Sequence, residues 1–176
     1  MASKILIIFI SSIMMFQLVL PSLATYENVP TAAKKVDVVV EGMVYCQSCK
    51  HFGTWSLSEA EPIPSAKVSV VCKNHRDQVS YYKAFETDGN GYFYGELEGF
   101  KLSNYLFDHP LQSCNVKLVS SPLENCSLLS NVNYGMYGAP LHFEKKTLAG
   151  RNYEAVIYTA GPLAFRPANC PPTTHY

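Results

Sequence analysis

The chain has 176 residues, of which 48% are hydrophobic, and it carries 14 Lys plus Arg against 14 Asp plus Glu. This length suits one domain with a core of its own. Because the charges balance, no overall positive field would attract nucleic acid or an anionic membrane, and an anionic partner must be met by a local patch.

The first 24 residues are typical of a secretory signal peptide. Lys4 is their only charge, and the apolar run "ILIIFISSIMMFQLVL" follows it. The run ends in "PSLA", which places Ser22 and Ala24 at the spacing of a cleavage site, and polar residues such as Gln17 interrupt it, which disfavours a membrane anchor. Cleavage would leave 152 residues with 13 basic and 14 acidic side chains. We expect a secreted protein without membrane contact.

Residues 25–35, "TYENVPTAAKK", are polar and contain a proline, so we expect a flexible leader before a single domain over residues 36–176. Within that domain, apolar and polar residues alternate with period two and β-branched residues are frequent, as is typical of half-buried strands. This pattern predicts strands over 36–41, 66–73, 79–85, 91–97, 114–120 and 153–159.

Turn signals complete the expected fold. The segment "ETDGNG", with Asp88–Gly91 at its centre, predicts a hairpin between the strands 79–85 and 91–97. It is not a calcium loop, because Tyr92 stands where an oxygen ligand is needed. A short helix is expected near "KLSNYLFDHPL", and the tail from Gly161 has too much proline for a central strand. We therefore predict an all-β fold, an antiparallel β-sandwich or small β-barrel of about seven strands.

Six cysteines in a secreted chain predict three disulfides. They are Cys46, Cys49, Cys72, Cys114, Cys126 and Cys170. The Cys-x-x-Cys pair follows a strand, whereas a redox pair normally begins a helix, and no second pair supplies the other ligands of a zinc site. Residues three apart in a strand project to opposite faces, so Cys46 and Cys49 should have different partners.

The strand pattern narrows the pairing. Cys72 shares a strand face with Val68 and Val70, and Cys114 shares one with Val116. Both therefore point into the core, which favours a Cys72–Cys114 bridge. Cys46 and Cys49 then share the remaining two cysteines in either of two ways.

The sequence indicates binding and not catalysis. It has no Gly-x-Ser-x-Gly, Walker loop or paired histidines, and acidic pairs such as Glu59/Glu61 are typical of solvated strand faces. We expect no enzymatic activity, no cofactor and no metal. Asn125-Cys126-Ser127 is the only N-glycosylation sequon, and the disulfide candidate at its centre would make its occupancy partial.

Two groups of side chains are candidates for carbohydrate binding. Exposed aromatic rings can stack on sugars, and Tyr92 and Tyr94 share a strand face, although the pattern leaves open whether that face points outward. If Cys72 and Cys114 point inward, a basic stripe on the opposite face could bind a galacturonate polymer. Its residues are Lys67, Ser69, Lys73 and Lys117.

The stretch "EGMVYCQSCK" resembles the signature of the Ole e I-like family of pollen allergens and extensin-like proteins. The resemblance continues in "SAKVSVVCKN", "TDGNGYF", "CNVKLVSSPLENC" and "GPLAFRPANCPP", and so covers nearly the whole mature chain. It is strongest to the C-terminal PAC domain of plant proline-rich and arabinogalactan cell-wall proteins. Gln47, Ser48 and Lys50 depart from the residues common in the allergen branch.

The resemblance implies a disulfide pairing and a function. The implied bridges are Cys46–Cys126, Cys49–Cys170 and Cys72–Cys114. The implied function is binding of pectin, galactan or arabinogalactan in the non-covalent networks of the plant cell wall. An alternative is an extracellular signalling ligand that binds the ectodomain of a receptor kinase.

Overall fold

A computed structural model describes residues 35–100, 109–151 and 153–170. The expected signal peptide and all of the expected leader except its last residue lie outside the described residues. The described strands are β1 Lys35–Cys46, β2 Glu61–Pro62, β3 Lys67–Lys73, β4 Val79–Glu86, β5 Tyr92–Glu96, β6 Cys114–Ser120, β7 Leu128–Leu129, β8 Ala139–Pro140, β9 His142–Ala149 and β10 Tyr153–Arg166. The described helices are short: η1 Cys49–His51, α2 Pro110–Ser113, η3 Glu124–Cys126 and η4 Val132–Tyr134.

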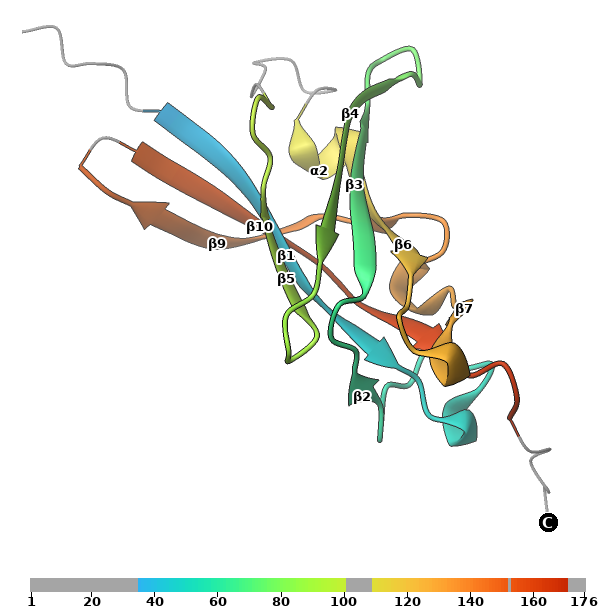
Figure 1. The fold of residues 1–176 in the computed structure, drawn as a ribbon. Coiled ribbons are helices and arrows are strands. Elements are labelled where there is room, and N and C mark those ends of the chain that lie inside the picture. Colours follow the sequence, from blue (N-terminus) through green and yellow to red (C-terminus); the bar gives the residue numbers. More distant parts are fainter. Residues whose placement is uncertain (1–34, 101–108, 152, 171–176) are drawn as a thin grey trace, which may run out of the picture. The chain divides into compact units, whose positions relative to one another are not determined.

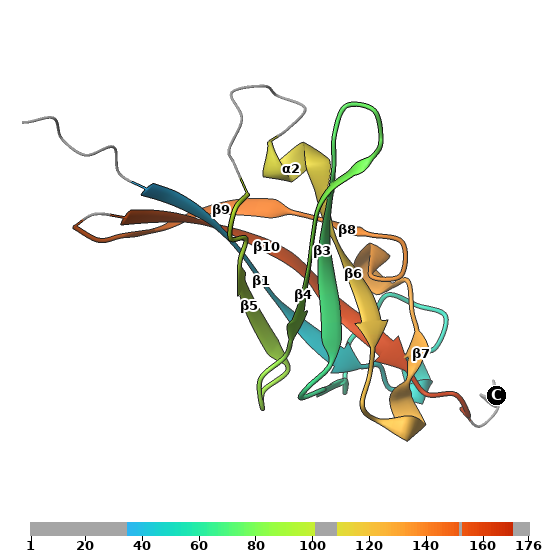
Figure 2. The ribbon, with the colours of Figure 1, turned by 45° about the horizontal axis from the view of Figure 1, so that its top comes forward.

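These strands form two sheets (Figures 1 and 2). The first, called sheet A, has the order β2-β1-β10-β7, with β5 also paired to β1 and β9 to β10. The second, sheet B, has the order β4-β3-β6-β8. The expected all-β class with two sheets and three disulfides is therefore confirmed.

The core lies between the two sheets because alternate residues of each strand are apolar. Val40 and Val44 of β1 meet Val68 and Val70 of β3 there, and all four are fully buried. A second, smaller cluster lies on the outer face of sheet A and consists of Val39, Ala155 and Ile157. No helix in the described parts of the chain is both long and apolar enough to cross a membrane.

The predicted hairpin between β4 and β5 is wrong. The turn forms as expected, since the Asp88 carboxylate accepts hydrogen bonds from the backbone N–H groups of Asn90 at 2.8 Å and Tyr92 at 3.0 Å. However, β4 pairs with β3 in sheet B, whereas β5 pairs with β1 in sheet A. The alternation of apolar residues fixes which side of a strand faces the core but not which strand lies beside it, so the turn could not distinguish a hairpin from a crossover.

The central pair of sheet A also differs from expectation. β1 and β10 are parallel neighbours, although we predicted an antiparallel fold, and β10 continues through Gly161 and Pro162 to Arg166. The register between the two strands shifts at this point, with Gly42 opposite Ala160 but Val44 opposite Leu163. A bulge of this kind leaves an extra residue unpaired, which is how a proline fits inside a central strand.

Candidate functional site

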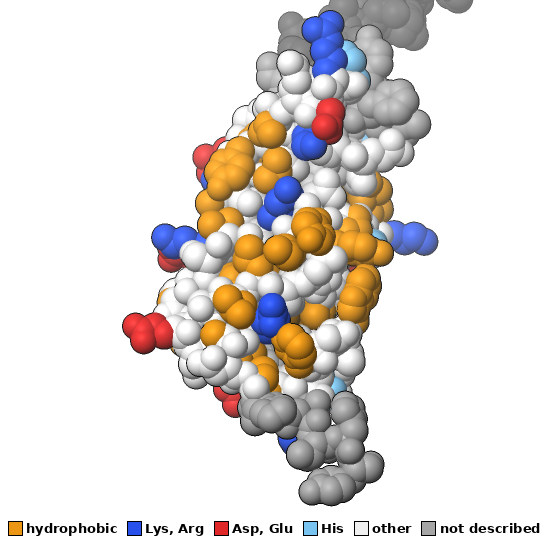
Figure 3. Space-filling view, turned by 90° about the vertical axis from the view of Figure 1, so that its right-hand side faces the viewer, with side chains coloured by type: hydrophobic (Ala, Val, Ile, Leu, Met, Phe, Trp, Pro, Cys, Tyr) orange, Lys and Arg blue, Asp and Glu red, His pale blue; other side chains and the backbone are white. Residues whose placement is uncertain are grey.

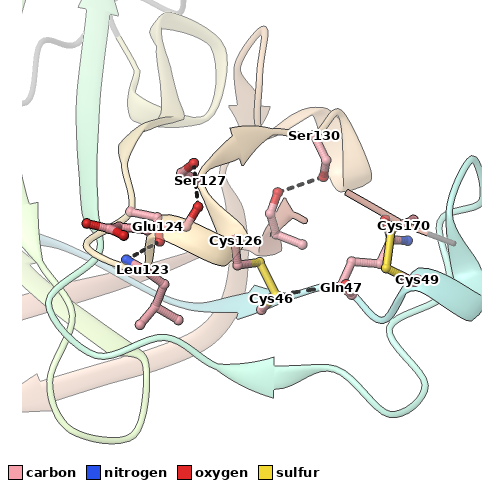
Figure 4. Close-up of a disulfide and its surroundings, with 11 residues drawn as sticks. Cys46, Gln47, Cys49, Leu123, Glu124, Cys126, Ser127, Ser130 and Cys170 are labelled. Atoms are coloured by element: carbon pink, nitrogen blue, oxygen red, sulfur yellow. Dashed lines mark hydrogen bonds between the residues drawn. A yellow bond between two sulfur atoms is a disulfide. The ribbon is translucent and has the colours of Figure 1, made fainter. Parts of the chain in front are cut away.

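The three disulfides join Cys46 to Cys126, Cys49 to Cys170 and Cys72 to Cys114. Figure 4 shows the first two. These are the pairs that the resemblance implies. Cys72 and Cys114 are buried neighbours on β3 and β6, as their strand faces predicted. The other two bridges start at the two cysteines of the Cys-x-x-Cys pair and lead to different parts of the chain. No cluster of three or more metal-ligating side chains occurs in the part of the chain that the structure describes.

Gln47, between the cysteines of that pair, fixes the loop that follows η1. Its side chain is only 2% exposed, and its Nε2 lies 3.1, 3.0 and 2.9 Å from the carbonyl oxygens of His51, Thr54 and Ser56. A buried amide that donates to several carbonyls holds their backbone in one conformation. Gln47 is one of the departures from the allergen branch, and here it acts as an anchor for the loop.

A polar groove of about 360 Å³ lies on the outer face of sheet B. Its volume is at the lower end of the range of small-molecule sites, about 300–1,000 Å³. We call it the sheet B groove. The residues that give it its chemistry are Lys73, His75, Gln112, Asn115, Lys117 and Tyr137.

Two of the three lysines expected to bind lie in the sheet B groove. Lys117 takes part in none of the ion pairs found among the described residues, whereas Lys73 pairs with Asp77 at 2.8 Å, also in the groove. Lys67 lies outside the groove and pairs with Glu86 at 3.4 Å. Ser69, expected on the exposed stripe, is instead buried, at the position opposite Lys117.

Most of the remaining groove residues were missed because they lie outside the strands, whereas Asn115 was missed although it shares a face of β6 with Lys117. His75 lies in the β3–β4 turn, which the Asn74 side chain stabilises by accepting hydrogen bonds from the N–H groups of Arg76 and Gln78. Tyr137 follows η4 and is 69% exposed. Only the β3–β6 register and the loop conformations bring these residues together, and a single sequence carries no signal for either.

The two tyrosines expected to bind sugar lie on a different surface. β5 turns Phe93 into the core, so Tyr92 and Tyr94 point to the outer face of sheet A. The Tyr92 hydroxyl donates to Glu41 Oε2 at 2.6 Å, and Lys146 Nζ donates to Glu41 Oε1 at 2.8 Å. The structure therefore does not bring the tyrosines together with the lysines.

This network sets the protonation of its members. Burial alone would raise the pKa of Glu41, but the hydrogen bonds from Lys146 and Tyr92 outweigh burial and hold that pKa below its ordinary value. Burial, together with the hydrogen bond to Glu41, raises the pKa of Tyr92 well above its ordinary value. The Tyr92 hydroxyl is therefore occupied within the protein, whereas Tyr94 is 48% exposed.

Asn125, the predicted glycosylation site, is exposed in η3, beside the buried Cys126.

One face of the molecule gathers hydrophobic side chains around several basic ones (Figure 3). Few acidic side chains lie among them, and most of those in view are near its edges.

No family model matches the chain. It is 36% identical over 141 residues to non-classical arabinogalactan protein 30 of Arabidopsis thaliana, which covers 78% of this chain and 55% of that protein. It is 33% identical over 129 residues to pollen allergen Sal k 5.0101 of Kali turgidum, which covers 72% of this chain and 75% of the allergen. The chain thus spans about half the length of the arabinogalactan relative.

The crystal structure of the major plantain pollen allergen Pla l 1 matches the fold. The TM-score is 0.52 at 26% sequence identity, and the match covers 77% of this chain and 98% of the allergen. The chain belongs to the Ole e I-like family of plant pollen allergens and extensin-like cell-wall proteins.

Proposed function

We propose that this protein is secreted to the plant cell wall and binds pectic and arabinogalactan-type polysaccharides without catalysis, through the sheet B groove. The observation that carries the proposal is Lys117, which joins no ion pair among the described residues and lies in a polar groove that also presents Tyr137. An unpaired cation suits the carboxylate of a galacturonate residue, and the exposed ring suits the C–H face of a sugar.

The Lys73–Asp77 ion pair does not oppose this function. Lys73 and Asp77 are 46% and 83% exposed, and exposed pairs contribute about 0–1 kcal/mol. A ligand carboxylate can therefore replace Asp77 at small cost. The amides of Gln112 and Asn115 add groups that both donate to and accept from sugar hydroxyls. Recurring carboxylates along one polymer make the interaction multivalent.

The test is calorimetric titration of the oxidised protein with oligogalacturonides, in low and high salt. We expect Lys73→Ala/Lys117→Ala to weaken binding about tenfold or more, which corresponds to the loss of one or two charge-assisted hydrogen bonds. Lys50→Ala is the matched control, because its side chain is 70% exposed and lies outside the groove. Binding in the parent should weaken as salt rises, because screening reduces attraction between exposed charges.

Equal affinities for the double variant and the control would remove the sheet B groove from this function. Salt-insensitive, saturable binding to one receptor-kinase ectodomain, with no binding to any wall polymer on a carbohydrate array, would instead support the signalling alternative.

A further inference from the structure

A second hollow of about 290 Å³ lies between the loop after η1 and the segment that runs from β7 to Met136. We call it the aromatic pocket, and it is lined by Phe52, Trp55, Leu129, Asn131, Met136 and Arg166. The segment after η4 separates the two hollows, since Met136 lines the aromatic pocket and Tyr137 lines the groove.

Side chains beside two of the disulfides hold the walls of the aromatic pocket, and two of them, Gln47 and Ser130, are labelled in Figure 4. Gln47 holds the loop that carries Phe52 and Trp55 through its contacts with three carbonyl groups. On the opposite wall, the Ser130 hydroxyl donates to the carbonyl oxygen of Ala164 at 2.6 Å. A pocket held in this way loses little conformational entropy when a ligand binds.

The aromatic rings in and beside the pocket are exposed and take no part in the core. Phe52, Trp55 and Tyr134 are 52%, 54% and 49% exposed. The rings of Trp55 and Tyr134 meet edge to face, with centroids 5.1 Å apart and an interplanar angle of 83°. The guanidinium of Arg166 lies over the ring of Phe52, 4.8 Å from its centroid. Grouped exposed aromatics of this kind mark binding surfaces.

The polar groups of the pocket restrict the ligand. Gln47, Thr54 and Ser130 spend their side-chain donors on carbonyl oxygens of the protein itself. In contrast, no hydrogen bond among the described residues uses the indole N–H of Trp55 or the guanidinium of Arg166. The free groups are therefore donors set beside aromatic faces, and they suit a ligand with apolar rings and accessible acceptor oxygens such as peptide carbonyls.

We propose that the aromatic pocket binds a proline-rich peptide in the polyproline II conformation. Proline has no N–H to satisfy, its ring packs on aromatic faces, and the carbonyl groups of a polyproline II helix point outward without internal partners. Trp55 and Arg166 supply the donors for those carbonyls.

A sugar fits the pocket less well, because its hydroxyl groups need several partners that both donate and accept, and Gln47, Thr54 and Ser130 are committed to carbonyl oxygens of the protein. The peptide site is independent of polysaccharide binding at the groove. Either function can therefore fail without the other.

The test uses decaproline and the disulfide-bonded protein. Trp55 is the single tryptophan of the chain, so peptide docking should shift its fluorescence to shorter wavelength in a saturable manner. In calorimetric titrations, Trp55→Ala should weaken decaproline binding about tenfold or more, as truncation of a central aromatic anchor does. Tyr82→Ala is the matched control, since it removes a ring that is 60% exposed on β4 and should leave binding unchanged.

Two further variants keep the result interpretable. Met136→Ala should also weaken decaproline binding, and it replaces Trp55→Ala if that variant alters the melting temperature. Lys73→Ala/Lys117→Ala should bind decaproline as the parent does. Absence of decaproline binding, or equal binding by Trp55→Ala and Tyr82→Ala, would overturn the proposal. Loss of galactan-oligomer binding in Trp55→Ala, without any response to decaproline, would identify a sugar site instead.

Discussion

Glu41 is a carboxylate on the outer face of sheet A that is only 8% exposed. Its two oxygens are separately bound, one by the Tyr92 hydroxyl and one by Lys146 Nζ. Glu41 lies on β1, directly before the glycine of the family signature. Because Tyr92 is on β5 and Lys146 is on β9, the two hydrogen bonds link β1 to both of those strands. At this scale the residue ties three strands together through one charge.

The protonation of Glu41 predicts how stability depends on pH. Its pKa is lowered in the folded protein, so its stabilising effect is complete above the ordinary carboxyl pKa and is lost as the pH falls through the folded value. Glu41→Gln should lower the free energy of unfolding by about 1.5 kcal/mol at pH 7, the low end for hydrogen bonds to charged groups because Lys146 is open to solvent. The difference from the parent should shrink toward pH 3 in urea denaturation curves.

The matched control is Glu61→Gln, which removes an exposed carboxylate outside this network. Its stability should follow the parent at every pH. A constant gap between Glu41→Gln and the parent from pH 7 to pH 3 would contradict the assignment.

At the scale of the strands, β1 and β5 approach closely because Gly42 has no side chain. A Cβ atom at this position would lie 2.4 Å from the carbonyl oxygen of Ala160 and 2.7 Å from the ring of Phe93. Phe93 is 1% exposed and forms part of the core. The glycine of the signature is therefore required by packing.

Gly42→Ala should destabilise the protein by about 1–3 kcal/mol, the usual cost of overpacking a core. Chemical denaturation measures the change. Gly89→Ala is the control, because a Cβ at Gly89 meets no atom within 4 Å. Equal stability of the two variants would show that Phe93 moves aside without cost.

The sequence predicted individual strands better than their arrangement. β3 and β6 lie within a residue of their expected limits, because period-two alternation depends only on neighbouring residues. The sequence did not predict β9, because its residues are all exposed and show no apolar face. It also assigned β5 to the wrong neighbour, since nothing local to β5 indicates that its partner is β1.

The same distinction applies to the candidate site. Lys73 and Lys117 were predicted from strand faces and do share the sheet B groove. The neutralisation of Lys73 by Asp77 depends on the conformation of a turn, as does the contribution of Tyr137. The aromatic pocket was not predicted, because Trp55 and Met136 are far apart in sequence and lie in loops without periodicity.

At the scale of the whole molecule, the disulfides span sequence separations of 42, 80 and 121 residues. Loops of this length give about 4 kcal/mol of stabilisation per bridge in the chain-entropy model, against a net stability of about 5–15 kcal/mol for a typical domain. Reduction should therefore unfold the protein. The measurement is far-ultraviolet circular dichroism during a thermal melt with and without reducing agent, and an unchanged melting temperature would contradict it.

The parallel pairing of β1 with β10 also governs when the protein can fold. The two strands come from opposite ends of the described chain, and β10 supplies the neighbour of β1 along almost its whole length. Sheet A cannot close until the chain has been synthesised through β10, so the edge of the valine-rich β1 that pairs with β10 stays open until then. Contacts between such distant segments form slowly and leave apolar strand edges open to association.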